Sequence, residues 1–158
     1  MEGSELTGVT SEKDLGVWIS ADMKYSKQCM YAFNKATRVL GMIKRAIRFK
    51  DTRGMLSLYK TLVRPHVEYC VRAWNPHYIK DKKLNEKVQR RFTKMINNME
   101  GKTYKERLDC LKLWALEARR NSQDLIEVFK MCSGLSRLKL NDLFTSDNKI
   151  RGTRGHSW

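Results

Sequence analysis

The sequence predicts a mostly α-helical protein, a small helical bundle preceded by a short β-strand or hairpin. Apolar residues recur at spacings of three and four through most of residues 26–132, which is the pattern of amphipathic helices. Strand character is confined to one short run near the N-terminus, rich in β-branched and aromatic residues. The 158 residues, 41% of them hydrophobic and 31% charged, are enough for one domain with a buried core.

Residues 1–25 differ in pattern from the rest of the chain. The run at residues 15–19, with sequence LGVWI, is bounded by polar residues and predicts one strand or a small hairpin. A single strand is unstable alone because its backbone edges need partners. Either the rest of its sheet lies elsewhere, or this segment frays.

The first long helix is predicted from Ser26, its expected N-cap, to about Phe49. Its apolar seam contains Cys29, Phe33, Ala36, Leu40, Ile43 and Ile47. The basic residues opposite or beside that seam are Arg38, Lys44, Arg45 and Arg48. These cations form the looser of two predicted basic stripes.

A second helix follows, for which Asp51 is the predicted cap. Its apolar residues are Met55, Leu56, Leu58, Leu62 and Val63. Pro65 then kinks or restarts the helix, because proline lacks an N–H donor and biases Arg64 away from helical geometry. The next turn runs to Trp74, and Asn75-Pro76 ends it. The sequence leaves the path of the chain around Pro65 open.

The stretch up to Ile96 predicts a helix with two faces. The apolar face consists of Leu84, Val88, Phe92, Met95 and Ile96. The basic face consists of Lys80, Lys83, Lys87, Arg90, Arg91 and Lys94, within roughly a third of the circumference. Like charges on one stripe repel each other, unlike the alternating charges of an ion-paired helix, so the stripe indicates an anionic partner.

The C-terminal part begins with a linker at residues 97–102. Thr103 and Glu106 have the spacing of a capping box, which predicts a short helix containing three leucines. A last helix, from about Leu116 to Cys132, is expected to bury Leu125, Ile126, Phe129 and Cys132, and to end at Gly134. The predicted domains are therefore a strand segment at 1–25, a helical domain at 26–134 and a flexible tail at 135–158.

The net charge of +15, with a pI of about 9.9, favours nucleic acid or an anionic surface over a neutral ligand. A basic protein with scattered lysines is the alternative.

The four cysteines match no zinc-binding spacing, and His66 with Cys70 is more typical of packing, so we predict no metal and no cofactor. The polar N-terminus and the lack of an apolar run of 18 residues predict no signal peptide and no membrane partner. The lack of a signal peptide therefore predicts an intracellular location, in the nucleus, the cytoplasm or both, with reduced thiols.

No catalytic residues are predicted. The sequence has no glycine-rich phosphate loop and no GxSxG elbow, and its aspartates are isolated from one another. Lysines and arginines on a helix would instead neutralise phosphates without reading sequence. Aromatic residues could stack on bases. Four of them lie on apolar stretches and are expected in the core, namely Tyr59, Tyr69, Trp74 and Trp114.

Several segments, in order along the chain, carry a family resemblance. They are LGVWIS, KATRVLGMIKR, LYKTLVRPHVEYCVRAWNPH, KVQRRFTKMI, YKERL, DLIEVFK and TRGHS. Together they resemble the part that follows the polymerase motifs in reverse transcriptases of jockey-like non-LTR (LINE-type) retrotransposons. The resemblance implies that Leu15-Gly16-Val17 is the end of a palm domain and that the basic helix belongs to the thumb, which grips RNA template and DNA primer. It also explains the isolated strand, whose sheet would be the palm.

The family's catalytic motif, an aromatic or similar residue followed by Ala-Asp-Asp, does not occur in this sequence. The sequence therefore predicts a catalytically inert fragment that binds the backbone of RNA, DNA or an RNA–DNA hybrid, with a palm supplied by another chain as a further partner. The alternative is a helical interaction module, or a relic with no selected role. Such a module would use Trp18, Ile19 and the first helix's seam, and could self-associate through exposed apolar surface.

Overall fold

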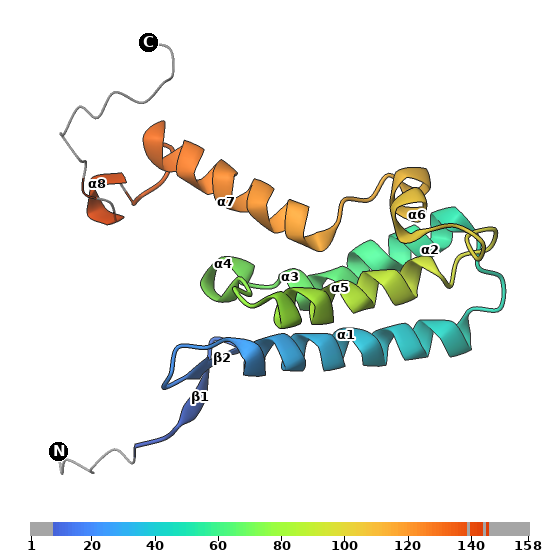
Figure 1. The fold of residues 1–158 in the computed structure, drawn as a ribbon, viewed down its shortest axis with the longest axis horizontal. Helices are drawn as coiled ribbons and strands as arrows, with labels where there is room; N and C mark the ends of the chain where they lie inside the picture. Colours follow the sequence, from blue (N-terminus) through green and yellow to red (C-terminus); the bar gives the residue numbers. More distant parts are fainter. Residues whose placement is uncertain (1–7, 139, 144, 146–158) are drawn as a thin grey trace. The chain divides into compact units, whose positions relative to one another are not determined.

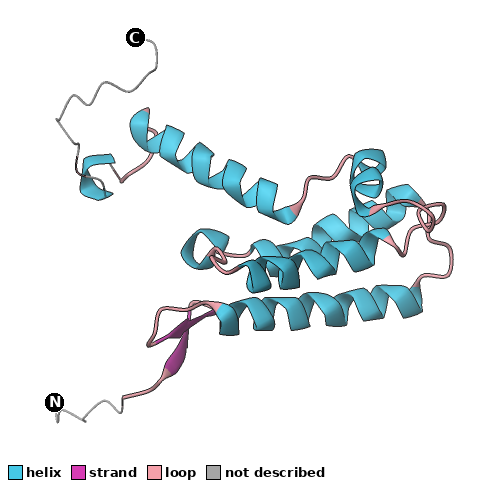
Figure 2. Cartoon of the chain, in the orientation of Figure 1, coloured by secondary structure: helices cyan, strands magenta, loops and turns pink. Residues whose placement is uncertain are grey.

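Helices make up most of the chain, and a two-stranded hairpin precedes them (Figures 1 and 2). The computed structural model describes residues 8–138, 140–143 and 145. The elements are β1 (Ser11–Asp14), β2 (Val17–Ser20), α1 (Ser26–Ala46), α2 (Thr52–Leu58), the π-helical turn η1 (Tyr59–Val63), α3 (Arg64–Glu68), α4 (Val71–Trp74), α5 (Ile79–Thr93), α6 (Tyr104–Leu111), α7 (Leu116–Cys132) and α8 (Leu140–Leu143). The predicted fold class, a mostly helical bundle after a short hairpin, is confirmed.

The chain divides into two compact units, residues 1–121 and residues 122–158. The first unit contains the hairpin and the helical bundle, and the second contains the rest of α7 together with α8. Most of the predicted tail at 135–158 lies outside the described residues.

The N-terminal segment is an antiparallel hairpin in which Ser11 pairs with Ser20 and Asp14 with Val17. Leu15 and Gly16 connect the strands with φ values of +44° and +88°. Two successive residues with positive φ match the right-handed twist of the strands, and glycine favours this geometry. The hairpin is therefore set by its local turn.

The hairpin is held against the helical bundle. Val17 is buried in a small cluster with Cys29, Ala32, Val71 and Trp74. The backbone N–H of Trp18 donates to Gln28 Oε1 at 3.0 Å, and the Tyr69 hydroxyl donates to the Leu15 carbonyl at 2.9 Å. Contacts to α1 and to the residue after α3 thus tie down a two-stranded sheet that would be unstable alone.

Helix α1 carries the predicted apolar seam. Cys29, Ala36, Leu40 and Ile43 are buried, and the helix ends at Ala46, three residues before the predicted end. The predicted N-cap was wrong, because Ser26 is the first helical residue and its hydroxyl donates to Asp81 Oδ2 at 2.6 Å. A bond to a neighbouring helix therefore replaces the expected local cap.

The main core lies where α1, η1, α3 and α5 meet. Tyr59 and Phe92 stack at its centre, with ring centroids 4.2 Å apart and both side chains fully buried. Leucines from α6, the following connector and the first residue of α7 close the core, namely Leu108, Leu111, Leu113 and Leu116. Burial of the apolar side chains of this core is the main force that holds α5 against α1.

Pro65 does not end the helix before it. The backbone N–H of Arg64 bonds to the Tyr59 carbonyl, which gives one π-helical turn, and Arg64 keeps helical angles of φ −58° and ψ −38°. Proline has no N–H to donate, and the wider turn accommodates its missing hydrogen bond. The chain then leaves α3 through Cys70, which has a left-handed φ of +50°.

Two predicted caps are present as expected. Asp51 accepts the Gly54 N–H at 2.8 Å at the start of α2. Thr103 and Glu106 form a reciprocal capping box on α6, with the Thr103 N–H donating to Glu106 Oε2 at 2.7 Å. These hydrogen bonds lower the pKa of Glu106. Both caps could be predicted from the local sequence because the two residues of each cap lie within four positions of each other.

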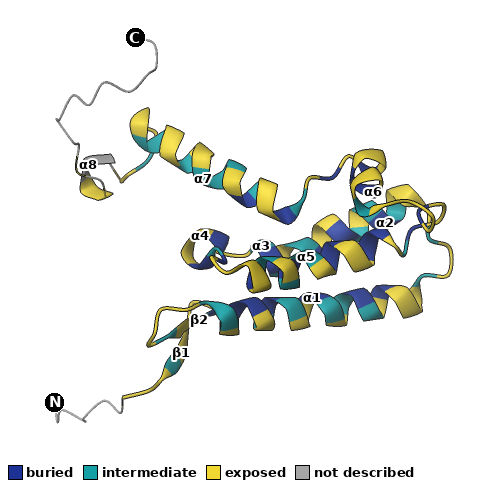
Figure 3. Ribbon diagram, in the orientation of Figure 1, coloured by how far each residue is buried: buried dark blue, intermediate teal, exposed yellow. Residues whose placement is uncertain are grey.

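The predicted burial of the second half of α7 was wrong (Figure 3). Leu125 is 71% exposed and Phe129 is 64% exposed, and Ile126 and Cys132 are also exposed. The apolar periodicity is present in the sequence, but periodicity only identifies a face and does not supply the surface that covers it.

The cysteines differ sharply in accessibility. Cys29 is fully buried, and burial together with the Asp81 carboxylate raises its thiol pKa to about 12. Cys70, Cys110 and Cys132 are exposed.

Since the thiolate is the reactive form, we expect brief alkylation with iodoacetamide at neutral pH to modify these three exposed cysteines and leave Cys29 unmodified. Peptide mass spectrometry measures this, and alkylation of Cys29 in denaturant is the control. Equal modification of all four in the folded protein would contradict the packing of α1.

Candidate nucleic-acid interface

Six basic residues of the α5 region lie exposed on one face, which we call the α5 basic face. They are Lys80, Lys83, Lys87, Arg90, Arg91 and Lys94, the last at the C-cap of α5. At about 100° per residue these positions span roughly 100° of the helix. Val88 and Phe92 occupy the opposite, fully buried face. The core therefore holds α5 in the orientation that turns its cations outward.

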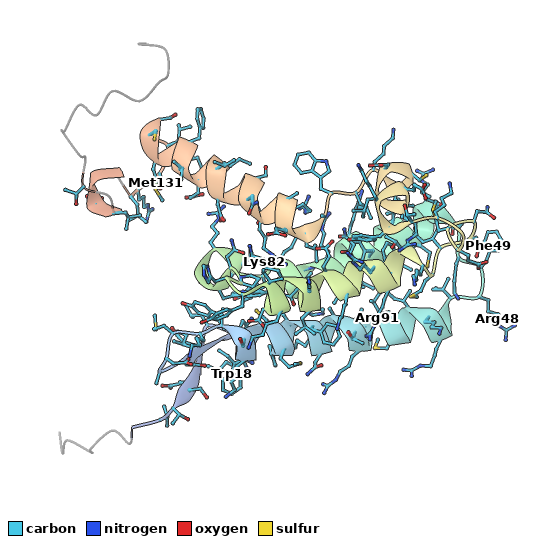
Figure 4. All side chains as sticks on the ribbon, viewed as in Figure 1. Trp18, Arg48, Phe49, Lys82, Arg91 and Met131 are labelled. Atoms are coloured by element: carbon cyan, nitrogen blue, oxygen red, sulfur yellow. The ribbon has the colours of Figure 1, made fainter. Side chains whose placement is uncertain are left out.

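The charge of this face is not compensated by acidic residues. None of its members forms an ion pair with another described residue. Lys82 lies on the other side of α5 from Arg91 (Figure 4), and Lys82 Nζ pairs with Glu117 Oε1 at 2.8 Å. The two acidic residues of α5 are also engaged elsewhere, Asp81 with Ser26, and Glu86 with the Tyr104 hydroxyl and the Leu116 N–H.

Aromatic rings support both arginines of the face. The guanidinium carbon of Arg90 lies 4.4 Å from the Tyr104 ring centroid. That of Arg91 lies 5.4 Å from the Phe33 ring centroid. Cation–π contacts use the flat side of a guanidinium and leave its N–H donors in the plane for other partners. The arginines are thus positioned without losing their capacity to bind an anion.

A groove with a volume of about 500 Å³ separates part of this face from α1. Lys44 lines it from α1, and Arg91 and Lys94 line it from the α5 side. Lys50 also lines it, a residue that sequence reasoning missed because it belongs to neither predicted stripe. The groove therefore joins the two stripes at Lys44, Arg91 and Lys94.

The other members of the α1 stripe lie outside this groove. Arg38, Arg45 and Arg48 are exposed, but none of them lines it. Arg48 lies beyond the end of α1, at the end of the bundle opposite the hairpin residue Trp18 (Figure 4). Of the four basic residues of the α1 stripe, only Lys44 therefore shares a groove with the α5 basic face.

A second groove, of about 580 Å³, runs along the other side of the α5 basic face. Lys83, Lys87 and Arg90 line it together with Tyr104, and the carboxylates of Glu86 and Glu117 line it as well. The α5 basic face is therefore a cationic ridge with a hollow on each side.

A buried glutamine fixes the wall of the second groove. Gln89 is 1% exposed, accepts from the Tyr59 hydroxyl at 2.7 Å, and donates to the Tyr104 hydroxyl at 3.2 Å and to the Trp114 carbonyl at 2.9 Å. Burial and the Glu86 carboxylate raise the pKa of Tyr104, which keeps its hydroxyl protonated. The connector between α6 and α7 is thereby tied to α5.

Two of the four aromatic residues predicted to be buried are exposed instead. Tyr59 and Trp74 are fully buried, as expected. Tyr69 is 54% exposed and Trp114 is 62% exposed. Both lie outside the helices, so helical spacing could not determine their orientation.

Among the described residues, no group of three or more histidine, cysteine, aspartate or glutamate side chains is arranged to hold a metal ion. No helix in the described part of the chain is long and apolar enough to cross a membrane. No protein-family model, curated protein or solved structure matches this chain.

Proposed function

We propose that this protein binds the phosphate backbone of nucleic acid through the α5 basic face. The observation that carries the proposal is the exposure of six cations on one helical face, none of them in an ion pair within the described residues. Lysines and arginines arranged in this way neutralise phosphates and release counterions. The net charge of +15 supports association with a polyanion.

Binding through this face would show little sequence preference. Contacts to phosphates position a protein on nucleic acid but carry no information about the bases. The hollow on one side of the face is lined by Lys44 and Arg91, and the hollow on the other side by Lys87 and Arg90. Carboxylates also line both hollows, Glu100 the first, and Glu86 and Glu117 the second. We therefore expect the phosphate contacts along the ridge of cations between them.

The resemblance to jockey-like retrotransposon reverse transcriptases extends this proposal. In that interpretation the bundle is a thumb-like fragment, catalytically inert alone, whose partner is RNA, DNA or an RNA–DNA hybrid. The hairpin would be the end of a palm supplied by another chain. The collinear order of the resembling segments supports this interpretation.

A second candidate function is protein interaction, and the exposed apolar side chains on α7 favour it. Leu125, Ile126 and Phe129 form an exposed set in the second unit. The seam of α1, proposed from sequence as the contact surface, is instead covered by the protein's own core, and Trp18 is half-buried beneath Lys27. Sedimentation velocity over a concentration series, without nucleic acid, tests self-association. A strict monomer would argue against this candidate.

The test of the main proposal is binding to a labelled RNA–DNA primer–template duplex across a salt series. About six phosphate contacts predict a slope of log affinity against log salt of roughly −4 to −5. Competition with unlabelled RNA and DNA then shows which is preferred. Absence of binding at low salt would mean that the α5 basic face is only solvated surface, and would refute the proposal.

A further inference from the structure

Trp114 presents a large exposed aromatic surface on a fixed backbone. Trp114 is 62% exposed, while its carbonyl accepts a hydrogen bond from the buried Gln89 at 2.9 Å. Leu113 and Leu116, on either side in sequence, are 8% and 1% exposed and are part of the core. Tryptophan usually buries most of its surface, so an indole held outward by anchored neighbours suggests a contact with a ligand.

A basic hollow adjoins this indole. Its volume is about 210 Å³, and Trp114 lines it with Lys60, Arg64, Lys112 and Arg119. Drug-sized ligands occupy pockets of about 300–1,000 Å³. The hollow is smaller than this, which favours one charged group of a longer molecule over a whole small molecule.

The charges in the hollow are only partly neutralised. Glu68 pairs with both arginines, at 3.4 Å to Arg64 Nε and 2.6 Å to Arg119 Nε. Lys60 and Lys112 have no ion-pair partner within the described residues. No carboxylate lines the hollow. It therefore retains an excess of positive charge directly beside an exposed indole.

From this combination we infer a binding site for single-stranded nucleic acid, in which an unpaired base stacks on Trp114 and an adjacent phosphate binds Lys60 and Lys112. Single-strand binding surfaces combine aromatic platforms with cations in this way, and stacking tolerates any base. The site shares no residue with the α5 basic face. It rests on the proposed function for the class of partner and adds the requirement for an unpaired strand.

The inference is tested by measuring affinity for a short single-stranded RNA and for a blunt-ended RNA–DNA hybrid. Trp114→Ala should weaken binding of the single strand by about tenfold, within the range measured for removal of one stacking interaction, and leave hybrid binding unchanged. Trp114→Phe should lie between Trp114→Ala and the unmodified protein. Phe49→Ala, which removes another exposed aromatic ring, is the matched control and should have no effect. Lys60→Gln with Lys112→Gln should also weaken single-strand binding.

A second measurement does not depend on the folding of a variant. Stacking should quench the fluorescence of Trp114 when single-stranded RNA is added to the unmodified protein, and the quenching should be smaller in Trp114→Phe. Equal single-strand affinity of Trp114→Ala and the unmodified protein, or equal quenching in Trp114→Phe, would overturn the inference.

The two proposals fail in different ways. If Lys83→Gln with Lys87→Gln and Lys94→Gln leaves hybrid binding intact while Trp114→Ala weakens single-strand binding, the α5 basic face is refuted and the Trp114 site stands. If only the lysine variant weakens binding, the α5 basic face stands and the Trp114 site is refuted. If the unmodified protein binds neither ligand, both are refuted.

Discussion

Phe92→Ala is expected to lower the free energy of unfolding by about 3–5 kcal/mol. Phe92 is fully buried, and its ring stacks on Tyr59 at a centroid distance of 4.2 Å. Its removal leaves a cavity between α5 and η1 and takes away apolar packing on both sides. A decrease of this size is a large part of the total stability of a typical domain, about 5–15 kcal/mol.

Urea unfolding followed by circular dichroism measures this decrease as a shift in midpoint at an unchanged slope. Phe49→Ala is the matched control, because it makes the same chemical change at a side chain that is 76% exposed. We expect that control to lie within about 0.5 kcal/mol of the unmodified protein. If the two variants are destabilised equally, the packing of α5 on η1 is wrong.

Arg90→Glu with Arg91→Glu is expected to weaken nucleic-acid binding on the order of 100-fold, if each arginine–phosphate interaction contributes about 1.5 kcal/mol. Both side chains are exposed on the α5 basic face and lie over aromatic rings. The salt slope should fall by roughly two, one for each phosphate that the variant no longer binds. The weakening should be similar for unrelated nucleic-acid sequences, because phosphates are common to all of them.

Arg53→Glu with Arg137→Glu is the matched control for this experiment. It changes the net charge of the protein by the same amount, at two exposed arginines outside both grooves. We expect it to reduce affinity far less than the change at Arg90 and Arg91. An equal reduction would show that net charge alone drives binding, and a reduction confined to one nucleic-acid sequence would contradict backbone recognition.

Thermal unfolding of both double variants separates binding from folding. Arg90 with Tyr104 and Arg91 with Phe33 form cation–π interactions, worth about 0.5–1 kcal/mol at exposed sites. Their removal should lower the unfolding midpoint only slightly. A variant that remains folded and does not bind would locate the defect at the interface.

Features that depend on residues close together in the chain could be predicted from the amino-acid sequence. The seam of α1, the Asp51 cap and the capping box of Thr103 and Glu106 follow from spacings of three and four residues. The exposure of the α5 basic face follows in the same way, since helical geometry sets its cations apart from Val88 and Phe92. These features can be predicted without knowing which helices pack against each other.

Which surfaces meet could not be predicted from the sequence. The hairpin packs on α1, the chain passes Pro65 through a π-helical turn, and Lys44 and Lys50 line the same groove as Arg91. Trp114 and the second half of α7 are exposed, although their apolar sequence predicted burial. The physical reason is that local spacing determines which face of an element is apolar or charged, whereas burial and proximity depend on partners distant in sequence.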